Sequence, residues 1–171
     1  MKNRISTLLV LAVVTIALST DAFGQTGASA TATAAATIVS PIAISKDVDM
    51  SFGNVAVNTN PGTVVLATDG SRTSTGGVTL PATTGTVTAA SFTVTGTTGY
   101  TFAISLPASV TVSLGANNMT VDNFSSSLGA TGTLTAGTAT LNVGATLNVL
   151  GSQAPGNYVS GTPFTVTVNY N

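Results

Sequence analysis

The chain has 171 residues, of which four are Lys or Arg and five are Asp or Glu, and it contains neither His nor Cys. Because so few cations cannot form a basic patch for phosphate groups, we expect no nucleic-acid partner. Because Cys is absent, no disulfide can stabilise the fold. With His, Cys and Glu all absent, few groups titrate near neutrality, which argues against general acid–base catalysis and favours a non-enzymatic protein without a cofactor.

Residues 1–24 have the pattern of a secretory signal peptide. The start is positively charged, the apolar run Leu8–Leu18 is too short for a comfortable membrane span, and small residues at Ala22 and Gly24 suit a signal peptidase. We predict cleavage before Gln25; an uncleaved anchor is the alternative, although no stop-transfer run follows. The expected location is the periplasm, the outer surface or the extracellular medium, with no transmembrane segment after cleavage.

Residues 25–40 alternate between small apolar and hydroxyl side chains. The apolar positions proposed for strand addition are Ala30, Ala32, Ala34, Ala36 and Ile38. This period of two predicts a strand longer than usual, which Pro41 and a predicted turn at Lys46-Asp47 separate from the rest of the chain. Such an arm either pairs within its own sandwich or is donated to a neighbouring copy, and the sequence leaves both options open.

Residues 41–171 predict a β-sandwich domain. Thr makes up 30 of the 147 residues after the predicted cleavage site, and β-branched Thr and Val favour extended backbone. Short strands are predicted at Phe52–Val57, Thr63–Ala67, Gly77–Leu80, Val110–Leu114, Met119–Phe124, Thr131–Leu134, Thr138–Val143 and Ala145–Val149. The last two are either consecutive strands or one strand with a kink at Gly144. Turn signals at Asn60-Pro61-Gly62, Asp69-Gly70, Gly115–Asn118 and Pro155–Asn157 separate them, which is typical of an antiparallel sandwich.

Two further strands flank a glycine-containing turn. Side chains alternate from Tyr100 to Leu106, and the strand before them changes phase near Ala89-Ala90, which predicts a bulge. Gly96–Gly99 would then join the two strands as a hairpin.

The clearest strand closes the chain. Phe164, Val166, Val168 and Tyr170 alternate with Thr and Asn, so we predict that these four side chains form the core face of a C-terminal strand. Pro163 lacks an N–H group and suits the first residue of such a strand.

The densest group of charges is Lys46, Asp47 and Asp49. The two carboxylates could supply oxygen ligands to calcium, but the full loop pattern of such sites is absent and Asp is common in turns. We therefore favour a turn and solvated surface here, and we predict no catalytic, cofactor-binding or metal site.

Several motifs along the chain match the pattern of a known family. They are Ala36–Ile44, Phe52–Val55, Gly76–Pro81, Met119–Phe124 and Leu141–Val149. With them the chain resembles the domain of unknown function 4402, found in small secreted bacterial β-proteins, over about residues 28–171. The resemblance implies an immunoglobulin-like β-sandwich exported by a Gram-negative bacterium, with no established activity.

A more distant resemblance concerns the closing hairpin. Ala154–Gly161 followed by Phe164–Tyr170 is similar to the end of spore-coat-U-like secreted pilins, and more distantly to chaperone–usher pilins. In the latter an incomplete sandwich accepts an N-terminal strand from the next subunit, which implies a periplasmic chaperone and usher as partners. Two departures are the small Ala side chains of the arm and the missing cysteine pair.

Three functions are consistent with these features. The first is a pilin-like structural subunit of a bacterial surface fibre or coat, assembled by β-strand addition and self-association. The second is a monomeric cell-surface binding or adhesion module. The third is a functional amyloid, which the low charge permits but the scarcity of Gln and the six Pro residues disfavour.

Overall fold

A computed structural model describes residues 27–171, in which a β domain begins at Ile38. The predicted signal peptide, residues 1–24, lies outside the described residues. The described part forms strands and turns without a helix, so no helix there meets the length and apolarity that a membrane crossing requires. The prediction of an all-β antiparallel fold is confirmed.

Thirteen strands run through the described domain. They are β1 (Ala43–Val48), β2 (Ser51–Phe52), β3 (Ala56–Leu66), β4 (Arg72–Thr79), β5 (Val87–Thr88), β6 (Ala90–Thr95), β7 (Thr101–Ser105), β8 (Ser109–Leu114), β9 (Asn117–Ser126), β10 (Thr131–Thr133), β11 (Thr138–Val149), β12 (Val159–Ser160) and β13 (Thr167–Tyr170). They form an eight-stranded sheet around β11, a three-stranded sheet in the order β10–β7–β13, and a two-stranded sheet of β2 and β5.

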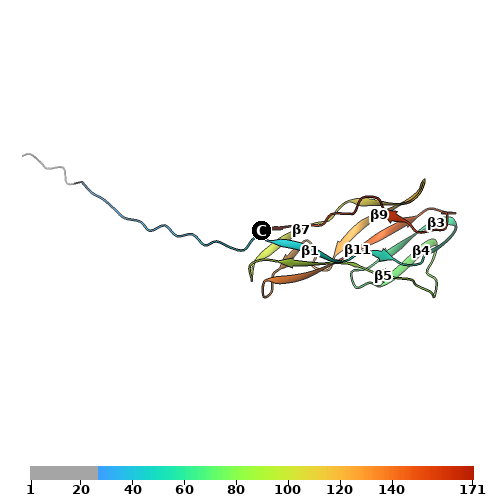
Figure 1. Cartoon of the computed structure of the whole chain (residues 1–171), viewed down its shortest axis with the longest axis horizontal. Helices are drawn as coiled ribbons and strands as arrows, with labels where there is room; N and C mark the ends of the chain where they lie inside the picture. Colours follow the sequence, from blue (N-terminus) through green and yellow to red (C-terminus); the bar gives the residue numbers. More distant parts are fainter. Residues whose placement is uncertain (1–26) are drawn as a thin grey trace, which may run out of the picture. The chain divides into compact units, whose positions relative to one another are not determined.

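Strand β11 is the longest strand of the large sheet and connects its two halves. Its first half pairs with β6 and its second half with β3, while β9 pairs along the opposite edge. Figure 1 shows β1 and β7 at one end of the domain and β3 and β4 at the other. The sequence predicted either two consecutive strands here or one strand with a kink at Gly144; the structure has a single strand, and its register with β9 shifts between Gly144 and Thr146.

Two apolar clusters lie on the inner face of the large sheet. The first combines Leu141 of β11 with Phe102 of β7 and Val168 of β13, so the three-stranded sheet packs face to face against it. The buried members of the second cluster are Val64, Val78, Val121, Ala145, Leu147 and Val149. Within the described residues, the three-stranded sheet contributes nothing to this second cluster.

The predicted hairpin across Gly96–Gly99 is wrong. Strand β6 pairs with β1 and β11 in the large sheet, whereas β7 pairs with β10 and β13 in the other layer. The turn therefore carries the chain from one sheet to the other. Near Ala89 the predicted phase change is present as a break between β5 and β6, which belong to different sheets.

Two predicted turns are also wrong. Lys46-Asp47 lies inside β1, which pairs with β6 through most of its length. Asn60-Pro61-Gly62 lies inside β3, where the register with β4 shifts between Val57 and Gly62. Both segments are therefore irregular strands, because pairing with a neighbour outweighs the local turn preference of Asp in the first segment and of Asn, Pro and Gly in the second.

The arm is the remaining feature of the described chain. Residues 27–42 lie outside any strand, and every side chain from 27 to 38 is exposed. The alternating sequence of the arm therefore has no sheet partner in this structure.

Candidate functional site

The layer opposite the large sheet consists of two separate pieces. The three-stranded sheet covers the first cluster, and the two-stranded sheet of β2 and β5 lies by the second. Phe52 of β2 packs against the second cluster, whereas Phe164, just before β13, packs against the first. The two pieces thus leave a gap over the inner face of the large sheet.

An apolar groove of about 1210 Å³ occupies this gap. Its floor is formed by Ala90, Phe92, Val110, Val112, Met119, Val121, Leu147 and Val149 of the large sheet. One wall is the segment from Val48 to Val57, and the other is the segment from Gln153 to Phe164. Such a volume exceeds that of most small-molecule pockets, so the groove suits an extended chain better than a compact ligand.

Two exposed large apolar side chains line this groove. They are Val48, which is 41% exposed, and Val159, which is 59% exposed. In the arm, Ile38 is 96% exposed. Exposed apolar surface that gathers in one place marks an interaction site more often than scattered exposed residues do.

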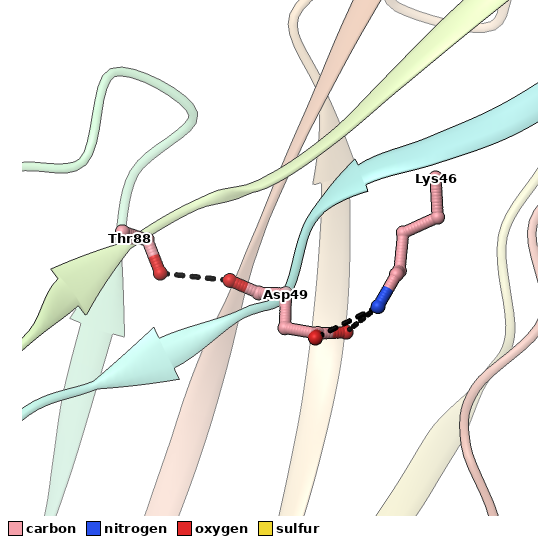
Figure 2. A network of polar contacts seen from close by, with 3 residues as sticks. All are labelled: Lys46, Asp49 and Thr88. Carbon is pink, nitrogen blue, oxygen red and sulfur yellow. Dashed lines mark hydrogen bonds and ion pairs between the residues drawn. The ribbon is translucent and has the colours of Figure 1, made fainter.

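A small polar network holds the first wall, as Figure 2 shows. The Lys46 ammonium lies 2.7 Å from both carboxylate oxygens of Asp49, and the Thr88 hydroxyl donates to the Asp49 carbonyl at 2.7 Å. Arg72 also donates to the carbonyls of Phe52 and Asn54. Lys46 and Arg72, the two cations within residues 27–171, therefore both bond to the wall of the groove.

The carboxylates of Asp47 and Asp49, the two possible calcium ligands of the sequence, each bond to another side chain. Asp47 accepts a hydrogen bond from the Thr93 hydroxyl, and Asp49 is paired with Lys46. The amide and hydroxyl of Ser71 donate to the carboxylate of Asp69 and lower its pKa. Residues 27–171 contain no group of three or more acidic, His or Cys side chains placed to hold a metal.

The structure places the four predicted core residues of the C-terminal segment in the first cluster. Val166 and Val168 are buried, and Phe164 and Tyr170 are partly buried. The ring of Phe164 contacts the ring of Phe124 at a centroid distance of 5.1 Å. Strand β13 begins only at Thr167, however, so the segment from Pro163 to Val166 is not part of a sheet, although its side chains alternate between exposed and at least partly buried.

Tyr170 fixes the point where the arm joins the domain. Its hydroxyl donates to the Ser40 carbonyl at 2.9 Å and accepts from the Thr97 amide at 2.7 Å. The Ser40 amide in turn donates to the Thr97 hydroxyl at 2.9 Å. The chain therefore enters β1 from a fixed position beside the C-terminus.

The Tyr170→Phe substitution should measure this anchor. It removes two hydrogen bonds and leaves the Ser40 carbonyl and the Thr97 amide without that partner, so we expect a loss of about 1–2 kcal/mol in the free energy of unfolding. Tyr100→Phe is the matched control: its ring contacts Tyr170 at 5.5 Å, and within residues 27–171 its hydroxyl has no hydrogen bond. Urea unfolding of both variants checks the prediction; equal losses would contradict it.

Fold and groove together define an antiparallel β-sandwich whose second layer is incomplete. The chain belongs to the family of DUF4402, a domain of unknown function, whose family model matches residues 42–170. No curated protein and no solved structure matches the chain.

Proposed function

We propose that this chain is a non-enzymatic exported structural protein, a pilin-like subunit of a bacterial surface fibre or coat assembled by β-strand addition. The groove of one copy takes the N-terminal arm of another. The observation that carries the proposal is an apolar groove of about 1210 Å³ in a domain whose own alternating arm lies outside every strand over residues 27–42. Pairing an unpartnered strand with an unfilled groove is a common mode of protein assembly.

The position of the arm's base supports a head-to-tail arrangement. Ser40 is held beside Tyr170, ahead of the start of β1, whereas the groove begins at Lys46 and continues over β8 and β9. Donor and acceptor surfaces are therefore different parts of the domain. A contact between two different surfaces repeats from copy to copy and generates an open filament unless a ring closes.

Deleting residues 25–38 is expected to convert the assembled protein into a folded monomer. The deletion removes the donor strand and leaves the domain from Val39 onward, whose strands begin at Ala43. Size-exclusion chromatography with light scattering measures the change, and electron microscopy shows whether fibres are lost. A synthetic peptide of residues 25–38 should bind the shortened domain. A full chain that stays strictly monomeric at all concentrations would overturn the proposal.

The second candidate is a monomeric surface-binding or adhesion module. The size of the groove favours this candidate, since the Ala side chains of the arm fill less space than large aliphatic residues would. Burying a Leu or Ile side chain contributes about 1.5–3 kcal/mol, and burying an Ala side chain contributes well under half of that. Under this alternative the shortened domain should bind unrelated apolar peptides more tightly than the arm peptide. Neighbouring genes for a periplasmic chaperone and usher would favour the first candidate.

A further inference from the structure

The two pieces of the second layer each have an unpaired edge. In the described residues β2 pairs only with β5, and β13 pairs only with β7. Pro163–Val166, which leads into β13, belongs to no sheet, and its side chains alternate between exposed and at least partly buried, as in a strand. Backbone N–H and C=O groups at such edges are ready to pair with another strand.

The groove lies between the edge of β2 and the segment that leads into β13. Its lining includes both residues of β2 but none of β5, and it includes Pro163 and Phe164 but no residue of β7. Within residues 27–171 the lining also lacks any residue of β13, so the groove is bordered by the β2 edge of one piece and by the segment that leads into β13 of the other. The floor between them is the apolar face of the large sheet.

We infer that the arm of a second copy joins the two pieces into one continuous sheet. The added strand lies between β2 on one side and Pro163–Val166 on the other, in the order β5–β2–arm–β13–β7–β10. This inference rests on the proposed function and names the two backbone edges that recognise the arm. In this order, every strand of the completed layer lies opposite the large sheet.

This arrangement accounts for the small side chains of the arm. A strand bonded along both edges gains its affinity from two ladders of backbone hydrogen bonds, which do not depend on side-chain size. The acceptor supplies bulk of its own, because Phe52, Met119 and Phe164 line the groove. Ala positions let the arm enter this crowded groove, and Ile38 is the single large aliphatic side chain on the apolar face of the arm.

Disulfide trapping tests the two edges separately, since the chain contains no Cys of its own. One Cys is placed in the arm at Thr33, and a second at either Ser51 of β2 or Thr165 beside β13. Neighbouring strands bring Cα atoms to about 5 Å, within the range that a disulfide spans. Thr73→Cys, at the outer edge strand β4 and absent from the groove lining, is the matched control.

We expect oxidation to link copies through the arm to both Ser51→Cys and Thr165→Cys, at least tenfold more than to Thr73→Cys. Hydrogen exchange needs no substitution and should show amides in β2 and in Phe164–Val166 gaining protection on assembly. Assembly that depends on the arm but protects only one edge, or links preferentially to Thr73→Cys, overturns this inference and leaves the proposed function standing. A full chain that never assembles overturns both this inference and the proposed function.

Discussion

Replacing Val110 by Asp is expected to abolish arm-dependent assembly while the monomer stays folded. Val110 is half-buried in the floor of the groove and packs on the second cluster. In the monomer a carboxylate there can keep part of its hydration, but an added strand would cover it without an opposite charge nearby. Burying an unpaired charge costs several kcal/mol, and about 3 kcal/mol already corresponds to more than a 100-fold loss of affinity.

Thr111→Asp is the control for this substitution. Thr111 is the next residue of β8, is exposed, and lies on the outer face of the large sheet because successive side chains of a strand alternate. The Thr111→Asp substitution adds the same charge to the same strand, so the two variants have the same net charge and the same new residue in β8. Sedimentation velocity at several concentrations compares the two. If both variants assemble alike, the groove is not the acceptor surface.

The period-two pattern predicted the strands well because it reflects burial on one face. Leu141, Val143, Ala145, Leu147 and Val149 all lie buried on the inner face of β11, as the alternation requires. The pairing partners were harder to predict. At Gly96–Gly99 the turn residues indicate a reversal of the chain, but whether the next strand pairs or crosses to the other layer depends on distant contacts such as Thr97 with Tyr170.

The error at Asn60-Pro61-Gly62 has a similar cause. Turn chemistry predicts a reversal there, yet β3 continues and reverses only at Asp69-Gly70, where the Gly70 amide donates to the Ala67 carbonyl at 3.0 Å. A Cβ at Gly62 would collide with the Thr75 carbonyl of β4. Gly62 is thus required by the close approach of two strands, which sequence patterning cannot distinguish from a turn.

The groove itself could not be predicted from the sequence. Val110, Val112 and Met119 do alternate with polar residues, so an apolar face was expected. Alternation predicts that one face of a strand is apolar, but it does not predict whether another strand of the same chain packs against that face. The arm was recognised as a candidate strand, whereas its matching surface, formed by segments near residues 50, 110 and 160, depends on long-range topology.

The core over the first half of β11 depends on one aromatic side chain and one glycine. Phe102 of β7 is fully buried and lies directly opposite Gly132 of β10, with Tyr170 of β13 on its other side. A Cβ at Gly132 would collide with the Phe102 ring. The Phe102 ring therefore packs over Gly132, and the ring can take this position only because residue 132 has no side chain.

Phe102→Ala is expected to lower the free energy of unfolding by about 3–5 kcal/mol, since it leaves a large cavity between the layers. Gly132→Ala should cost about 1–3 kcal/mol, because the added methyl group forces the ring to move. The double variant should lose clearly less than the sum, because the smaller residue at 102 makes room for the methyl group at 132. Urea unfolding of the arm-deleted domain, which separates folding from assembly, gives all three values. Strictly additive losses would show that the two residues do not share one packing site.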